Sequence, residues 1–94
     1  MFDFAKQAQE ARRLLQVGRK GLATVVAVRD TGVMVDENPQ AELDLQVAVA
    51  GVEPYTVTHR QVIPPTKIPS VQVGAPVPLR VDPMDVNRVL IVGI

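Results

Sequence analysis

The spacing of apolar residues changes once along the chain, near residue 20. Over residues 3–17 the apolar positions recur every three or four residues, which predicts an amphipathic helix. From residue 21 onward, apolar and polar residues alternate in short runs that Gly, Pro, Asp and Asn separate, and this pattern predicts strands and turns. We therefore divide the chain into an N-terminal amphipathic helix, residues 1–20, and a small β domain, residues 21–94.

The predicted helix carries an apolar seam whose positions alternate by four and three residues, a spacing typical of paired helices. The seam consists of Phe4, Ala8, Ala11, Leu15, Gly18 and Leu22. Leu14 widens it, Asp3 can cap the first turn, and Gly18 can end the helix. Because an isolated helix of this length is marginal in water, we expect it to need a partner surface.

Five or six short antiparallel strands are expected after the helix. They are residues 22–29, 33–35, 41–50, 55–63, 77–81 and 88–94. The clearest alternation places Leu43, Leu45, Val47 and Val49 on one face of the third segment. Turns are expected at residues 30–32, 36–39, 51–54 and 82–83. Three prolines within residues 64–69 favour an extended loop across one end of the domain.

These elements predict a mainly β fold: a small antiparallel β-barrel, OB-like or SH3-like, with one N-terminal amphipathic α-helix. Closure into a barrel is the simplest way for so small a sheet to remove its edges. Only three aromatic residues occur, Phe2, Phe4 and Tyr55, so the core must consist of Val, Leu, Ile and Ala. Strand order stays open between the two barrel types.

Charge is unevenly placed, although the formal net charge is zero. Residues 1–20 carry five basic and two acidic residues, a balance of +3, and residues 21–94 carry five basic and eight acidic residues, a balance of −3. A basic helix beside an acidic body is compatible with a membrane surface or an acidic partner, and also with a merely solvated helix face.

The chain has no cysteine, which excludes disulfides, thiolate metal sites and thiol catalysis. No window approaches the roughly 20 apolar residues of a membrane-spanning helix, and the N-terminus lacks the apolar core of a signal peptide. We expect a soluble, cytoplasmic protein, with a membrane-peripheral position as the alternative, unless the chain was cut from a longer anchored protein.

Four segments together resemble a small β domain that is common in actinobacteria. They are residues 21–32, residues 38–39, Pro-Tyr-Thr-Val at 54–57, and Val-Pro-Leu-Arg-Val-Asp-Pro at 77–83. That domain occurs beside transmembrane helices or beside a short C-terminal oligomerisation module (SHOCT). The resemblance covers roughly residues 21–92 and implies a small β domain with no enzymatic activity and no agreed ligand. This chain departs from the membrane-linked members by carrying a basic helix where they carry spans.

The residues offer little for catalysis. His59 is the only histidine, and its neighbours on the same strand face are Val57 and Gln61. A catalytic nucleophile needs a base and an orienting group, and no serine lies near His59 in the sequence for it to activate. Asp82 and Asp85 fit the capping of a turn better than a carboxylate pair. We therefore expect no enzyme and no cofactor.

Metal and nucleic-acid sites are also disfavoured. Asp36, Glu37, Glu42 and Asp44 could bind calcium through oxygen atoms, but their spacing matches no EF-hand loop and a solvated turn explains them equally well. Residues 18–21 lack the pattern of a phosphate-binding loop. Binding of single-stranded nucleic acid needs aromatic platforms and a positive groove, and the strands offer Tyr55 alone on an acidic body.

Three uses of the helix remain open. In the first hypothesis it self-associates or binds another protein through an apolar contact, formed by Phe2, Phe4, Ala8, Ala11, Leu14 and Leu15. In the second it meets an anionic membrane surface, through Lys6, Arg12, Arg13, Arg19 and Lys20. In the third it packs on its own β domain. The predicted function is a non-enzymatic interaction or assembly module, and the alternative is a peripheral membrane or ligand-binding β-barrel.

Overall fold

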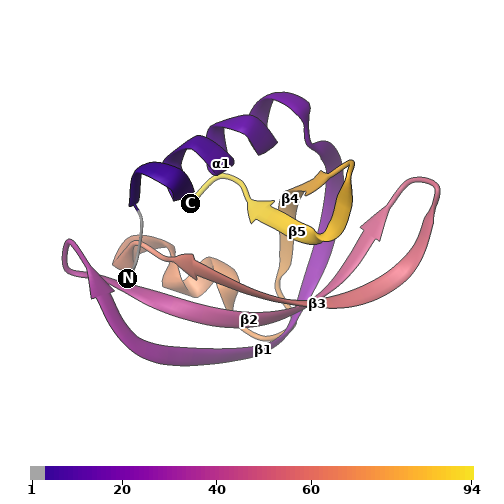
Figure 1. The fold of residues 1–94 in the computed structure, drawn as a ribbon. Coiled ribbons are helices and arrows are strands. Elements are labelled where there is room, and N and C mark those ends of the chain that lie inside the picture. The colour runs from indigo at the N-terminus through magenta and orange to yellow at the C-terminus, as the bar shows by residue number, and fades with distance from the viewer. Residues whose placement is uncertain (1–3) are drawn as a thin grey trace.

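The computed structural model describes the backbone from Phe4 to Ile94 and side chains from Ala8 onward. One helix is followed by five strands, with a 3₁₀ helix between the third and fourth strands (Figure 1). The elements are α1 (Phe4–Val17), β1 (Arg19–Val35), β2 (Asn38–Val49), β3 (Val52–Val62), η1 (Pro65–Val71), β4 (Pro76–Asp82) and β5 (Asp85–Ile91).

The strands form one antiparallel sheet in the order β3-β2-β1-β4-β5. Three strands follow one another as hairpins, and the fourth returns beside the first, which is the Greek-key order. The predicted mainly β fold with one N-terminal helix is confirmed. The backbone ladder does not join β3 to β5, so the sheet stays open at this seam and the structure does not establish a closed barrel.

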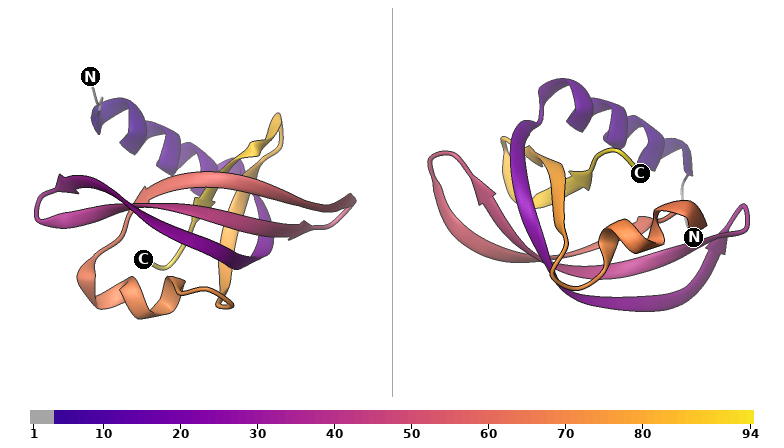
Figure 2. Two further views of the ribbon diagram at one scale, coloured as in Figure 1. Left: turned by 90° about the horizontal axis from the view of Figure 1, so that it is seen from below. Right: turned by 180° about the vertical axis from the view of Figure 1, so that it is seen from behind.

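The core comes from strict alternation on the inner face of the sheet. Leu43, Leu45 and Val47 of β2 are fully buried, as the sequence predicts. On β4 the same alternation buries Val77, Leu79 and Val81, with 1–3% of each residue exposed. Aliphatic side chains of this kind fill a small interior without large aromatic rings. Figure 2 shows α1 and η1 covering different parts of this sheet.

The expected turn at Asp30–Gly32 does not separate two strands. β1 continues through it as one 17-residue strand, and the register with β2 shifts between Val25 and Ala27 and again between Asp30 and Met34. Turn chemistry is nevertheless present: Gly32 has a φ of 81° and its N–H donates to the Asp30 carboxylate over 2.8 Å. This geometry is an irregularity within a strand, which bends and twists it.

The β1–β2 hairpin reverses at Asp36 and Glu37, within the segment predicted to turn. Both residues have positive φ, 49° and 66°. Two-residue hairpin loops favour this conformation at both central positions because its twist matches that of the strands. Asn or Gly usually occupies such positions, so this turn carries backbone strain that the long flanking ladder must hold.

The proline-rich segment after β3 is helical, so the prediction of an extended loop is wrong. η1 begins at Pro65, directly after Pro64, and contains Pro69. Proline is accepted in the first turn of a helix because its missing N–H would have no partner there. Short 3₁₀ turns tolerate such sequences, and Lys67 N–H donates to the Pro64 carbonyl over 2.8 Å. Val71, at the end of η1, is buried in the core.

The last hairpin turns at Pro83 and Met84, one residue later than the dipeptide that the sequence indicates. Asp82 accepts a hydrogen bond from Met84 N–H over 2.8 Å, and Asp85 accepts one from Asn87 N–H over 3.0 Å. The expected capping role of these two carboxylates is thereby confirmed. β5 covers Asp85–Ile91 instead of residues 88–94, because the tight turn lets pairing start immediately.

α1 ends at Val17 and packs against β4 and β5. Gly18 N–H donates to the Leu14 carbonyl over 2.8 Å, and the Gly18 carbonyl accepts from Arg80. A Cβ atom at residue 18 would clash with the Leu14 carbonyl oxygen and lie 2.8 Å from Arg80 Cβ. Gly18 therefore ends the helix because the chain passes close to its own backbone and to β4.

The exchange Gly18→Ala should destabilise the protein by about 1–3 kcal/mol, the usual cost of inserting a methyl group where no space exists. Urea unfolding followed by circular dichroism measures this change. Gln16→Ala is the matched control, because Gln16 is exposed on the same turn and should change the free energy of unfolding by less than about 0.5 kcal/mol. Equal stability of Gly18→Ala and the wild type would contradict the close approach.

Candidate functional site

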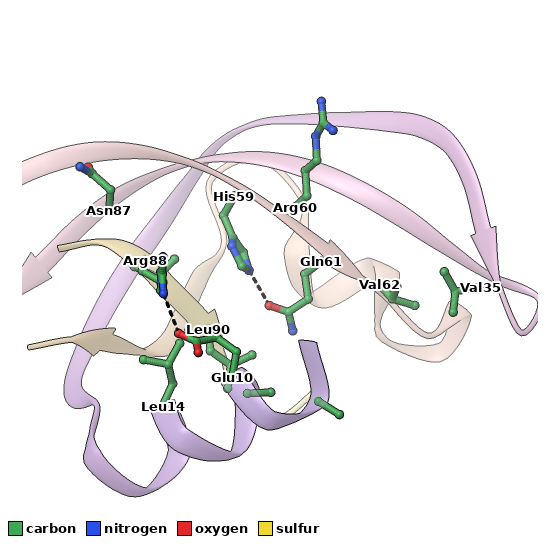
Figure 3. Close-up of a pocket in the computed structure, with 13 residues that line it drawn as sticks. Glu10, Leu14, Val35, His59, Arg60, Gln61, Val62, Asn87, Arg88 and Leu90 are labelled. Atoms are coloured by element: carbon green, nitrogen blue, oxygen red, sulfur yellow. Dashed lines mark hydrogen bonds and ion pairs between the residues drawn. The ribbon is translucent and has the colours of Figure 1, made fainter. Parts of the chain in front are cut away.

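A groove lies between α1, β3 and β5, where the sheet is open (Figure 3). It holds about 510 Å³ and is open to solvent. Ala8, Ala11 and Leu14 line it from the helix. Because two of these side chains are methyl groups, the helix leaves room beside β3. Glu10 also lines it from the helix, and the remaining lining side chains come from the tip of β1 and from β3 and β5.

The β3 wall places two polar side chains on the face that otherwise belongs to the core. Val57 and Ile63 point into the core, and His59 and Gln61 occupy the alternate positions between them, half-buried. In Figure 3 the Gln61 side chain points into the groove, whereas Arg60 points away from it. The backbone of β5 does not pair with β3 at this point. Side chains on the inner face of β3 therefore reach the open gap between the two strands.

Side chains join β3 to β5 at two places. The Gln61 amide donates to the Ile91 carbonyl over 3.1 Å, and its oxygen accepts from Ile91 N–H over 3.1 Å. The Tyr55 hydroxyl donates to the Val86 carbonyl over 2.7 Å. In a β-ladder, N–H and C=O groups of this kind are bonded through the backbones of neighbouring strands. Gln61 therefore makes with its side chain the bonds that a paired strand would make.

His59 lies beside this junction. Its Nε2 atom is 2.7 Å from the Gln61 side-chain oxygen. This atom is the oxygen of the amide, and not its nitrogen, because it accepts from Ile91 N–H while the other atom donates to the Ile91 carbonyl. Since an amide oxygen only accepts, the neutral imidazole carries its proton on Nε2. Burial lowers the pKa of His59, and the hydrogen bond to Gln61 opposes this shift. The ring is therefore neutral at physiological pH.

An ion-pair chain fixes α1 on the last hairpin. The Arg13 guanidinium contacts the Glu10 carboxylate at 2.6 Å and the Asp82 carboxylate at 2.5 Å. Glu10 also pairs with Arg88 of β5 at 3.1 Å. The Arg13 hydrogen bond lowers the pKa of both carboxyl groups, and the Met84 N–H adds to the effect at Asp82. Asp82 is only 3% exposed, so this contact links the helix to a buried charge.

The residues predicted for an apolar interface divide into four groups. Leu14 is 2% exposed and packs within this chain, so its side chain is not available to another molecule in this arrangement. Ala11 is half-buried, whereas Ala8 and Leu15 are exposed, Leu15 at 48%. Phe2 lies outside the described residues, and so does the side chain of Phe4. The helix therefore uses Leu14, outside the four-three seam, for its own docking.

The residues predicted for an anionic surface divide in a similar way. Arg13 is engaged in ion pairs with Glu10 and Asp82, and Arg19 donates to the Ala50 carbonyl. Arg12 and Lys20 are exposed. The side chain of Lys6 lies outside the described residues. Two of these five positions therefore contribute to this chain's own fold.

Of the acidic residues considered for calcium, two are engaged in ion pairs with arginines and the other two lie in a separate turn. Glu42 pairs with Arg29 and Arg60 at 3.0 and 2.8 Å, and Asp44 pairs with Arg29 at 2.8 Å. These hydrogen bonds lower the pKa of both carboxyl groups. Asp36 and Glu37 form the β1–β2 turn instead. Within the part of the chain that the structure describes, no cluster of His, Cys, Asp and Glu could hold a metal ion.

Sequence reasoning missed Gln61, Tyr55 and the Glu10–Arg88 contact as parts of the site. One signal was present: Gln61 shares the strand phase of Val57 and His59, so the core face of this segment carries two adjacent polar residues. A polar residue on a core face needs a hydrogen-bond partner. The partner, Ile91, lies 30 residues later and could not be named from periodicity.

Comparison of the chain with protein-family models, with curated proteins and with solved structures found no match. The resemblance to the actinobacterial β domain therefore stays a prediction. Among the described residues, no helix has the length and apolar character needed to cross a membrane.

Asp82→Asn should lower the free energy of unfolding at neutral pH, because it keeps an oxygen for Met84 N–H but removes the charge that faces Arg13. Asp85→Asn, which also keeps its turn oxygen, is the matched control and should change stability less. The pKa of Asp82 is lowered in the folded state, so the unfolded chain takes up the proton first. The extra stability of the wild type over Asp82→Asn is therefore fully present above a pH of about 3.9. It is lost as the pH falls through the lower pKa that Asp82 has in the folded state.

Urea unfolding of both variants at neutral and acidic pH measures these differences. A gap between the two variants that does not shrink in acid would contradict the ion pair as its cause.

Proposed function

We propose that this chain is a non-enzymatic interaction module that self-associates through the exposed side of α1. The observation that carries the proposal is the mismatch between the helix's apolar seam and its docked face. Leu14 is buried against the chain's own strands, while Leu15, a seam residue, stays 48% exposed, and Ala8, about two turns earlier on the same seam, is also exposed. The four-three spacing of this seam is that of helices which pack in pairs.

A second copy is the occupant that the charge distribution favours. Residues 1–20 carry a balance of +3 and the remainder a balance of −3, so the helix of one molecule complements the body of another. Arg12 and Lys20 are exposed near the helix, and Asp36 and Glu37 are exposed at the β1–β2 turn. Complementary charge steers association and weakens with added salt, whereas apolar burial does not.

The side chains that could carry chemistry are engaged in structural contacts, which supports a non-enzymatic role. His59 bonds to Gln61, and Asp82 bonds to Arg13 and to the turn. Glu42 and Asp44 are held by arginines on the outer face of the sheet.

We also propose an OB-like plan for the β domain. The Greek-key order, with β4 beside β1, is that of a five-stranded, partly open barrel of this type. Side-chain bonds at Gln61 and Tyr55 approximate the missing closure between β3 and β5. This order favours the OB-like alternative over the SH3-like one. The analogy concerns the fold alone and implies no activity.

Leu15→Glu should convert an oligomeric wild type to a monomer, because it places a charge in the apolar contact. Light scattering on size exclusion at micromolar concentrations measures the mass of the full chain. Gln16→Glu is the matched control, since Gln16 is exposed one position away and outside the seam. A wild type that is monomeric at every concentration, or an equal effect of both variants, would overturn the proposal.

A second candidate function is attachment to an anionic membrane surface. Exposed Leu15 and Val17 lie near exposed Arg12 and Lys20, a combination that amphipathic surface helices use. In that case the wild type should float with vesicles containing phosphatidylglycerol at low salt, and not with phosphatidylcholine vesicles. Replacing Arg12 and Lys20 by Gln should reduce flotation. No flotation with anionic vesicles at low salt removes this candidate.

A further inference from the structure

Two edge strands of the sheet, β3 and β5, run in the same direction and are joined by side chains. Strand order alternates direction from β3 through β2, β1 and β4 to β5, so the two edges are parallel. Tyr55 contacts Val86, and Gln61 contacts Ile91 further along both strands. We call these two contacts the β3–β5 seam. A seam held by two side chains opens with the loss of few bonds, unlike a backbone ladder.

At one of these contacts, the titratable ring of His59 and the Ile91 N–H share one acceptor, the Gln61 oxygen. The Gln61 oxygen accepts from Ile91 N–H at 3.1 Å and lies 2.7 Å from His59 Nε2. In the neutral ring Nε2 carries the proton, so an added proton goes to Nδ1. The resulting imidazolium is half-buried on the core face of β3, opposite the fully buried Leu43 of β2.

We propose that the β3–β5 seam is a latch that protonation of His59 opens. A charged ring in this position loses hydration that the surrounding apolar side chains do not replace. Turning the ring toward the open groove restores its hydration and withdraws it from the Gln61 oxygen. The Gln61 side chain then loses the hydrogen bond from His59 that fixes its orientation, and its two bonds to Ile91 weaken together. This inference does not depend on self-association through α1.

Among the side chains that the structure describes, the charged groups around His59 offer no free counter-ion to the added proton. On the α1 side, Glu10 is the carboxylate that lines the groove, and Arg13 and Arg88 already share it. β3 itself adds Arg60, which pairs with Glu42 on the outer face. On β2 the carboxylates Glu42 and Asp44 pair with arginines on that same outer face. At the far contact, burial and, to a smaller extent, the Asp85 charge raise the pKa of Tyr55, so the phenol stays protonated and takes no part.

Opening the seam would widen the groove and free the backbone of β5 at Ile91. An unpaired N–H and C=O on a strand edge are the groups with which a sheet adds another strand. The latch would therefore couple acidification to the exposure of a strand edge, a device distinct from the apolar seam on α1.

Amide hydrogen exchange followed by nuclear magnetic resonance, between pH 7.5 and 5, tests the latch on the full chain. The protection of the Ile91 amide, corrected for its intrinsic exchange rate, should fall in acid by about tenfold for each unit by which closure depresses the pKa of His59. Amides of the β1–β2 ladder serve as the internal reference and should keep their protection.

His59→Gln is the matched variant, because its amide can donate to Gln61 but does not titrate. Its Ile91 protection should be independent of pH. Gln61→Met, which removes the bonds at similar volume, should show low Ile91 protection at every pH, and should leave the β1–β2 amides protected. The latch is overturned if wild-type Ile91 protection does not change with pH. It is equally overturned if protection falls together with the β1–β2 ladder, or falls to the same extent in His59→Gln.

Discussion

The first strand is paired on both sides from Gly21 to Thr24, and this double pairing holds the rest of the chain in place. β2 lies on one side and β4 on the other, in registers that share these residues. Ala23 and Val25 face inward here and are almost fully buried. The backbone pairing that joins the β1–β2–β3 meander to the last hairpin, between β1 and β4, includes this stretch. The groove exists because the sheet that β1 organises brings its two outer strands near each other without pairing them.

The helix position follows from the same arrangement. Gly18 joins α1 to β1 with no room for a side chain, so the helix must lie close to β4. Leu14 is then buried where α1 packs on β4 and β5, and Arg13 pairs with Asp82. Leu15 is exposed because of this orientation. The close approach at Gly18, and not the widest apolar stripe, determines which face of the helix packs on the sheet. Intramolecular docking through Leu14 and the exposure of Ala8 and Leu15 are therefore compatible on a single helix.

Local patterns predicted the strands whose partners are neighbours in sequence. The alternation of Leu43, Leu45 and Val47 and that of Val77 and Leu79 are reproduced as buried rows. Predictions based on turn residues were less accurate, because Asp30 and Gly32 have the same local chemistry in a strand irregularity as in a turn. The proline segment was wrong for a related reason, since prolines exclude a regular helix interior but not a short 3₁₀ turn.

The groove could not be predicted, because its walls come together through pairings distant in sequence. His59 and Gln61 were visible as polar residues on a core face, but Ile91 and Val86 were not identifiable as their partners. Helix periodicity predicted Ala8 and Leu15 on one apolar seam, and both are exposed, but periodicity could not say which face of the helix would pack on the sheet after Gly18.

The double pairing of β1 also bears on how this chain reaches its fold. The β1–β2–β3 meander and the β4–β5 hairpin each close short loops, whereas joining β1 to β4 brings together residues such as Gly21 and Leu79. Loop closure over that distance costs entropy before any contact compensates for it, and distant pairings of this kind slow the folding of β proteins. We therefore expect two locally formed units that join late, with the small stretch Gly21–Thr24 as the place where they meet.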